Sequence, residues 1–141
     1  MNSAPLSEDS QAVSTHLQIL QGIIDRLASN SASCKTWCAT LVAAMLVLAF
    51  TKEIDLSPLV ALIPVAVLVY QDVTYLTLER DVRRAYNEFV RKLREGSATS
   101  GDLFVVAPTA PMNERLKTAA SWSVNLFYLP LAGAAIGLHF V

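Results

Sequence analysis

Three uncharged stretches constrain this chain more than any other feature. They run from Thr36 to Phe50, from Leu56 to Gln71 and from Thr118 to Val141. The third stretch is long enough to cross a bilayer, whereas the first two are shorter than the roughly 20 residues of an ideal span. By length alone, each of the shorter stretches is also compatible with a buried helix of a soluble protein.

The residues around the two shorter stretches favour a membrane hairpin. Between them lies the short polar segment Thr51–Asp55, and Ser57 with Pro58 then reads as an N-cap followed by a first-turn proline. Trp37 opens the first stretch and Tyr70 closes the second, as expected of an aromatic belt at a membrane interface. We therefore predict an all-α integral membrane protein with three transmembrane helices.

Composition and the placement of charge support this class and predict its orientation. Hydrophobic residues make up 53% of the 141 residues, mean hydropathy is +0.42 and net charge is −1, which gives no general attraction to nucleic acid. Most of the basic residues lie between the second and third stretches: Arg80, Arg83, Arg84, Arg91, Lys92, Arg94, Arg115 and Lys117. The positive-inside rule places that segment and the N-terminus in the cytoplasm.

The first two helices are predicted to extend beyond the bilayer. Apolar or small residues recur in alternating steps of four and three along one stripe: Val13, Leu17, Leu20, Ile24, Leu27, Ser31, Cys34, Cys38, Leu41, Met45 and Leu48. A second seam continues past Tyr75 to Leu93, so the second helix would measure about 55 Å. The simplest arrangement packs both extensions against each other as an antiparallel cytoplasmic stalk.

These patterns divide residues 1–141, taken as one membrane domain, into five segments. They are a flexible N-terminus (1–9), an amphipathic helix running into the first span (10–50), the second span with its extension (57–95), a loop (96–112) and the third span (113–141). Within the loop, four consecutive apolar residues, Leu103 to Val106, need cover from the stalk, a partner or the membrane surface.

Three polar residues lie where polarity is costly. If the hairpin turn is centred between Glu53 and Ile54, residues whose numbers sum to 107 share a depth, which brings Lys35 level with Asp72. Lys35 either pairs with Asp72 or extends alone to the headgroups. Asn125 is expected to hydrogen-bond to a neighbouring helix, or to line a pore if the chain oligomerises.

Small residues on two helices predict close helix packing. Ser31, Cys34 and Cys38 interrupt the apolar stripe of the first helix, and Gly133 with Gly137 forms a GxxxG motif in the third span. We interpret the motif as a packing site within the chain, with contact between copies as the alternative. Cys34 and Cys38 lie on the reducing side of the membrane, so a disulfide is not expected.

The sequence shows no catalytic constellation. There are two His, far apart, and no Cys/His cluster, so neither a metal site nor a cofactor is expected. No carboxylate pair or nucleophile with a base appears, which argues against an enzyme.

The chain resembles a family of small, largely uncharacterised bacterial three-span membrane proteins. The residues that carry the resemblance are Asn30-Ser31 with Lys35 and Trp37, then Asp72, Tyr75, Glu79-Arg80 and Tyr86, and finally Ser121-Trp122-Ser123 with Phe127-Tyr128. Residues 103–106 depart from it, because the family tends to carry a polar motif there. The resemblance implies a multi-pass protein of the bacterial inner membrane, and such families occur beside cytosolic sensors or enzymes in anti-phage systems.

Two functional hypotheses follow. In the first, the protein is an oligomeric membrane effector or channel-like accessory subunit that self-associates in the lipid bilayer and is controlled through its cytoplasmic helices. In the second, it is a membrane anchor or scaffold that recruits a soluble cytoplasmic protein partner through the stalk and the apolar loop.

Overall fold

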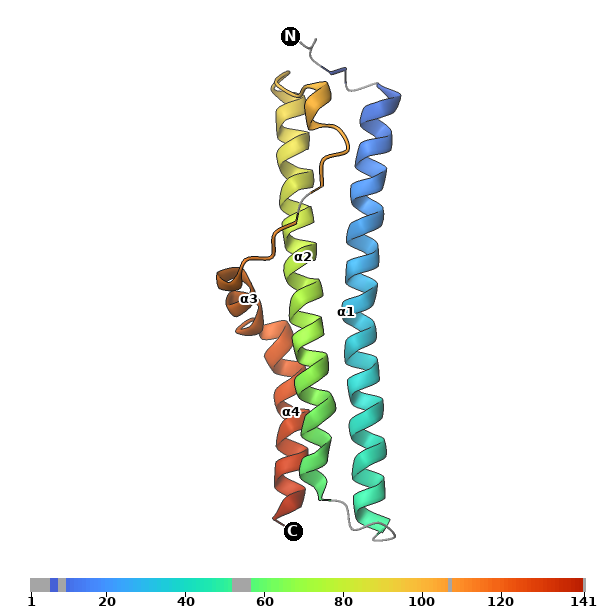
Figure 1. Cartoon of the computed structure of the whole chain (residues 1–141), viewed down its shortest axis with the longest axis vertical. Coiled ribbons are helices and arrows are strands. Elements are labelled where there is room, and N and C mark those ends of the chain that lie inside the picture. Colours follow the sequence, from blue (N-terminus) through green and yellow to red (C-terminus); the bar gives the residue numbers. More distant parts are fainter. Residues whose placement is uncertain (1–5, 8–9, 52–56, 107, 141) are drawn as a thin grey trace.

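The computed structural model describes residues 6–7, 10–51, 57–106 and 108–140, and every regular element in these ranges is helical (Figure 1). The long helices are α1 (Gln11–Thr51), α2 (Leu62–Arg94) and α4 (Trp122–His139), and α3 (Met112–Ala119) is short. Two 3₁₀ turns, η1 (Pro58–Ala61) and η2 (Ser100–Asp102), flank α2. The predicted all-α class is therefore confirmed. The predicted turn at 51–55 and the N-terminal segment 1–9 lie largely outside the described residues.

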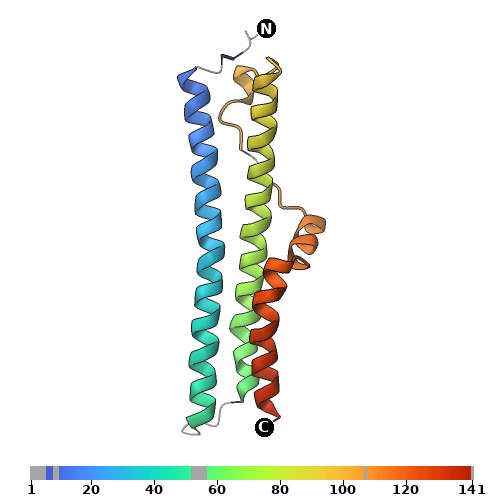
Figure 2. The same cartoon turned by 180° about the vertical axis from the view of Figure 1, so that it is seen from behind.

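Helices α1 and α2 lie side by side over most of their length (Figures 1 and 2). Val13, near the start of α1, packs with Phe89, near the end of α2. Leu20 and Ile24 pack with Val82 farther along. At the other end, a third cluster joins α1, η1, α2 and α4 through Cys38, Val42, Ala61, Val65, Val73, Val124, Tyr128 and Ala135. The apolar seam therefore continues from one end of the molecule to the other.

The buried face of α1 drifts away from the predicted stripe at its C-terminal end. Val13, Leu20 and Cys38 are buried as the stripe predicts, but Leu41 is exposed and Val42 is buried in its place. The predicted stripe repeats every 3.5 residues, whereas an α-helix has about 3.6 residues per turn and drifts by about 20° per heptad. Over the length of α1 this drift moves the contact face by one position.

Local sequence signals set both ends of the second helix. The Ser57 side chain accepts a hydrogen bond from the Leu59 amide, and Pro58 occupies the first helical position, as predicted. At the other end Gly96 has φ +65°, and the amides of Gly96 and Ser97 donate to the carbonyls of Leu93 and Lys92. This is a Schellman motif, and the left-handed conformation at Gly96 explains why glycine stands there.

The third predicted span differs from the prediction of one helix over 113–141. The structure has two helices, α3 and α4, with a bend of 61° between them. Ser121 adopts an extended conformation that restarts the chain as α4, while the Thr118 hydroxyl accepts a hydrogen bond of 3.0 Å from Arg80 on α2. The break in the helix therefore lies at Ser121, three residues after the contact that joins the end of α3 to α2.

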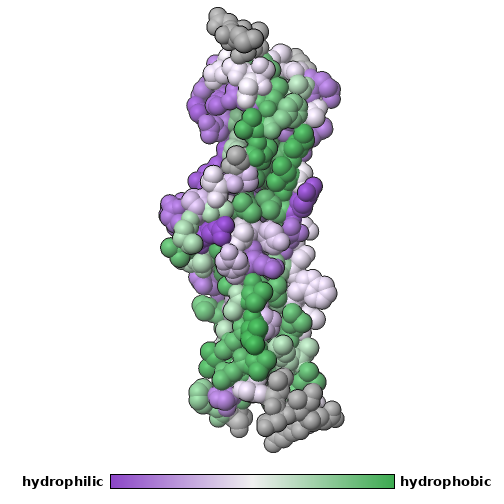
Figure 3. All heavy atoms as spheres, in the orientation of Figure 1, coloured by the Kyte–Doolittle hydropathy of each residue, from purple (hydrophilic) through white to green (hydrophobic). Residues whose placement is uncertain are grey.

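The surface of the lower half of the molecule is apolar, as the sequence predicts for contact with lipid (Figure 3). Large hydrophobic side chains point outward from all three long helices, including Val47, Phe50, Ile63, Val67, Leu126 and Leu129. Such an extended apolar surface is unusual for a protein dissolved in water. Two helices are long and apolar enough to cross a membrane, or three if the bent pair α3–α4 counts as one span. The 18 residues of α4 alone measure about 27 Å, close to the thickness of the hydrocarbon layer.

Candidate functional site: a buried polar cluster and an anchored loop

A polar cluster lies between α1 and α2, beside the apolar core. We define it by Ser31 and Lys35 of α1, Asp72 of α2 and Tyr128 of α4. The Lys35 Nζ lies 2.6 Å from Asp72 Oδ2, the Ser31 hydroxyl donates to Asp72 Oδ1 at 2.5 Å, and the Lys35 ammonium donates to Ser31 Oγ at 3.2 Å. The pairing of Lys35 with Asp72 that the depth rule raised is therefore present in the structure.

Burial within this cluster is asymmetric. The Asp72 side chain is 0% exposed, whereas the Lys35 side chain keeps 24% of its surface accessible. Lys35 can move its ammonium toward headgroups, but Asp72 has no route to water. Asp72 therefore depends on Lys35 and Ser31 for compensation far more than Lys35 depends on Asp72.

Helix α4 contributes Tyr128 to the cluster. Its hydroxyl oxygen is buried and makes no hydrogen bond of ordinary geometry to any described residue, although Asp72 is close enough to influence it. A buried hydroxyl without a partner is uncommon, since most buried polar atoms are paired. Nothing in the sequence points to a role for Tyr128 beyond its place in the aromatic pair Phe127-Tyr128.

The small residues of α1 lie in the contact with α2. Ser31, Cys34 and Cys38 are all buried, which fits the close approach that small residues allow. Both thiols are free, and the Cys34 Sγ lies 4.0 Å from Gln71 Oε1.

Asn125, Gly133 and Gly137 do not join this cluster. Asn125 is half-buried on α4, and its side chain makes no hydrogen bond within the part of the chain that the structure describes, contrary to our expectation of a bond to a neighbouring helix. Gly133 and Gly137 are exposed, and a Cβ on either would meet no atom within 4 Å. Packing of the GxxxG motif within the chain is therefore wrong, because the fully buried small residue of α4 is Ala135 instead. Contact between copies stays a prediction.

A second polar feature is the segment between α2 and α3, described at residues 95–106 and 108–111, which we call the anchored loop. The Phe104 amide donates to His16 Nδ1 at 3.1 Å, and Lys92 Nζ lies 2.8 Å from Asp102 Oδ1. Farther along, the Ala110 amide donates to Asp81 Oδ2 at 2.9 Å. Side chains of both α1 and α2 therefore hold this loop.

The electrostatics of the anchors match these contacts. The Lys92 ammonium, together with the Thr99 amide and hydroxyl, lowers the pKa of Asp102 to about 2. Burial alone would raise the pKa of Asp81, but the Ala110 amide and the Arg84 guanidinium hold it below its usual value. Burial also lowers the pKa of His16, which favours the neutral ring whose Nδ1 can accept the Phe104 amide. At neutral pH the carboxylates of Asp81 and Asp102 are therefore charged and the His16 ring is neutral, which are the forms that accept these hydrogen bonds.

Two loop residues have backbone conformations that L side chains rarely adopt. Phe104 has φ +61° and Ala110 has φ +39°. Each of these two residues donates its amide to a buried or half-buried acceptor, His16 or Asp81. Such conformations persist where surrounding contacts enforce them, and they concentrate at functional sites.

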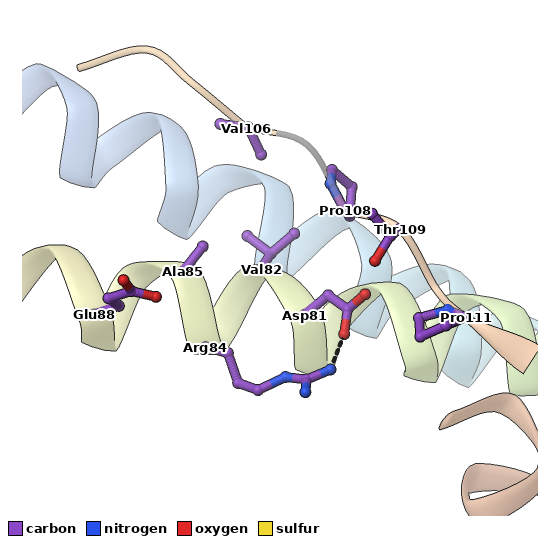
Figure 4. Close-up of a pocket in the computed structure, with 9 residues that line it drawn as sticks. All are labelled: Asp81, Val82, Arg84, Ala85, Glu88, Val106, Pro108, Thr109 and Pro111. Atoms are coloured by element: carbon purple, nitrogen blue, oxygen red, sulfur yellow. Dashed lines mark hydrogen bonds and ion pairs between the residues drawn. The ribbon is translucent and has the colours of Figure 1, made fainter. Parts of the chain in front are cut away.

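The anchored loop presents apolar side chains outward. Of the four apolar residues at 103–106, Leu103 and Val106 pack against the two clusters that contain Val13 and Leu20 of α1, whereas Phe104 and Val105 remain 56% and 62% exposed. Between the loop and α2 lies a cavity of about 370 Å³, lined by Asp81, Arg84 and Glu88 of α2 and by Val106, Pro108, Thr109 and Pro111 of the loop (Figure 4). A second cavity, of about 210 Å³, lies beside His16, Glu88 and Val105.

Sequence reasoning missed His16 and Asp81 as anchors. His16 lies three residues after Val13 and four before Leu20, so its helical position marked it as a residue of the buried face. The position of Asp81 in the sequence does not indicate that its carboxylate accepts a hydrogen bond from the Ala110 amide.

In the described ranges, no group of three or more His, Cys, Asp or Glu side chains could hold a metal ion. Comparisons with protein-family models, with curated proteins and with solved structures find no match to this chain.

Proposed function

We propose that the protein is a multi-pass membrane scaffold that recruits a soluble partner through the anchored loop. The observation that carries this proposal is the exposure of Phe104 and Val105 on a segment held by His16, Lys92 and Asp81. An apolar pair held in a fixed, strained conformation loses little conformational freedom when a partner binds, which favours affinity. Val105 also borders one of the loop's cavities, which offers a recess to a partner's side chain.

The orientation of the scaffold follows from charge. Eight of the eleven Lys and Arg lie between residues 80 and 117, so the anchored loop faces the cytoplasm of a bacterium whose inner membrane holds the spans. In this orientation the first part of α1 and the last part of α2 form an antiparallel cytoplasmic stalk, and the loop lies along it. The partner is then a cytosolic protein. If the family resemblance holds, that partner is the sensor or enzyme of an anti-phage system.

The polar cluster favours the scaffold hypothesis and argues against a channel. Asp72 is fully buried and is compensated by Lys35 and Ser31 of the same chain, so its charge faces another helix and not an open axis. A channel formed by several copies would need polar groups directed at a shared pore.

A second candidate, an oligomeric membrane effector, is favoured by one observation. The face of α4 that carries Gly133 and Gly137 is open, and small residues in that spacing allow helices of two copies to approach closely. Self-association through this face is compatible with a scaffold as well.

A photo-crosslinking amino acid at position 105 tests the two candidates in intact cells. A scaffold predicts one discrete adduct with a second protein, and Phe104→Ser should abolish it. The same crosslinker at Gln18, an exposed position on the stalk, serves as the matched control and should not give that adduct.

The outcomes separate the hypotheses. Adducts of this chain with itself alone, together with ion flux across vesicles that contain the purified protein, would favour the oligomeric effector and contradict the scaffold. Loss of the position-105 adduct in Phe104→Ser with unchanged membrane insertion would support recruitment through the loop.

A further inference from the structure

The short helix α3 is fixed in place beside α2. The Arg80 guanidinium donates to the Thr118 hydroxyl at 3.0 Å, and Arg115 donates through Nε to the Ala110 carbonyl at 2.9 Å and through a terminal nitrogen to the Tyr70 hydroxyl at 3.5 Å. Helix α3 protrudes from the side of the molecule where α4 begins (Figures 1 and 2). Its outer face therefore has a defined direction.

That outer face carries an apolar pair beside the polar side chains of Asn113 and Lys117. Met112 and Leu116, one turn apart, are both exposed, and Trp122 at the start of α4 is 76% exposed. Below them, Leu126 and Leu129 of α4 are exposed in the same way on the apolar part of the surface. Trp122, Leu126 and Leu129 are spaced i, i+4 and i+7, so they share one apolar face of α4 that begins where α3 ends. Tryptophan is enriched where an apolar membrane surface meets the headgroups.

Two arginines that hold α3 have no ion-pair partner among the described residues. Arg83, Arg84 and Lys117 each pair with a carboxylate, from Glu79, Asp81 and Glu114 respectively. Arg80 and Arg115 instead bond only neutral oxygens within the described ranges. Each guanidinium has five N–H donors, so both retain donors in the planar geometry that suits a phosphate.

We propose that α3 and the adjoining surface of α2 bind the headgroup of an anionic phospholipid. Arg80 and Arg115 hold the phosphate, and the acyl chains descend along α4 below Trp122. The site does not depend on the recruitment of a soluble partner. It assigns α3 a role as an interfacial helix whose bend against α4 sets the depth of the protein in the bilayer.

Lipid titration of the purified protein in mild detergent, followed by native mass spectrometry, tests the site. The probes are phosphatidylglycerol, phosphatidylcholine and inorganic phosphate. A basic residue near an anionic lipid surface contributes about a fivefold factor, so the two arginines together predict a preference for phosphatidylglycerol of about 25-fold. Arg80→Gln with Arg115→Gln should remove that preference.

The matched control is Arg83→Gln with Lys117→Gln. It removes the same number of charges from the same level of the molecule, but both residues are ion-paired. It should keep the preference. Equal loss in both double variants would mean diffuse attraction and would overturn the proposal. Binding of inorganic phosphate as strong as that of the lipid, or no preference in the unsubstituted protein, would overturn it as well.

Fluorescence gives a second measurement that does not depend on the fold of the arginine variants. The chain has two tryptophans, so Trp37→Phe leaves Trp122 as the only reporter. In vesicles of brominated phosphatidylglycerol, bromine near the headgroup should quench Trp122 more than bromine near the chain end. The absence of quenching would place α3 in water and refute the interfacial site.

Discussion

Removal of the Lys35 ammonium is expected to destabilise the helix pairing severely. Lys35→Met keeps the length of the side chain and leaves the Asp72 carboxylate, 0% exposed, with Ser31 as its remaining hydrogen-bond donor. Breaking a buried ion pair by removing one partner costs about 3–5 kcal/mol. We expect a loss of about 3–4 kcal/mol, on the order of a few hundredfold in the unfolding equilibrium constant.

The reverse substitution should be milder. Asp72→Asn keeps the shape and leaves Lys35, which is 24% exposed and can extend its ammonium to the headgroups. Individual polar contacts between membrane helices contribute about 0.6 kcal/mol on average and about 1.7 kcal/mol at most, so we expect a loss of about 0.6–1.7 kcal/mol. Replacing both residues, as Lys35→Met with Asp72→Leu, should bring stability within about 1 kcal/mol of the unsubstituted protein.

Unfolding in mixed micelles with increasing SDS, followed by thiol labelling, measures these differences. Cys34 and Cys38 are buried between α1 and α2, so a water-soluble maleimide should reach them only when these helices separate. Equal losses in the two single variants, or a double variant no more stable than Lys35→Met alone, would refute the asymmetric burial argument.

Three further predictions concern the anchored loop and its start. Burial lowers the folded-state pKa of His16 below its ordinary value of 6.5, so the neutral ring stabilises the fold fully above pH 6.5 and loses this effect as the pH falls below it. Hydrogen exchange of the Phe104 amide, which donates to this ring, should therefore accelerate at low pH. Unchanged protection of that amide would contradict the role of His16 as its acceptor. The pKa of Asp102 is lowered to about 2, so its contact with Lys92 should persist from neutral pH to about pH 4 and disappear as the pH approaches 2, which carboxylate NMR shifts would show. Gly96→Ala places a Cβ at φ +65° and should cost about 1–2 kcal/mol in thermal or SDS unfolding, whereas Gly22→Ala in the middle of α1, where a Cβ meets nothing within 4 Å, should not destabilise.

The long-range pairing of α1 with α2 could be predicted because, in a helical hairpin, the position of the turn alone determines which residues of the two helices lie at the same level. Once the turn is placed, each residue of one helix has a level on the other, and this placed Lys35 beside Asp72. The start of the second helix at Ser57-Pro58 was also readable, because cap residues act on amides two or three positions away.

The break between α3 and α4 could not be predicted by the same means. Residues 118–122 contain neither glycine nor proline, and they are as uncharged as the span that follows. The end of α3 is instead accompanied by a hydrogen bond from Arg80 of another helix to Thr118, a contact between residues 38 positions apart that the local sequence does not indicate. Likewise, the exposure of Gly133 and Gly137 depends on which face of α4 meets α2, and the sequence of α4 alone, apolar on all sides, does not decide it.

The strained conformation of Phe104 connects the exposed loop to the packing of the long helices. Holding a residue other than glycine in the left-handed region costs about 1–2 kcal/mol, and the bond to His16 of α1 offsets this cost. The His16 ring also packs edge-on against Phe89 of α2, with centroids 4.6 Å apart, so one buried side chain contacts the loop and both helices. A partner that binds Phe104 therefore affects the contact between α1 and α2 through the His16 ring. In His16→Ala, where the acceptor is missing, the exposed pair should remain accessible but lose its fixed conformation, and binding of the partner should weaken without loss of membrane insertion.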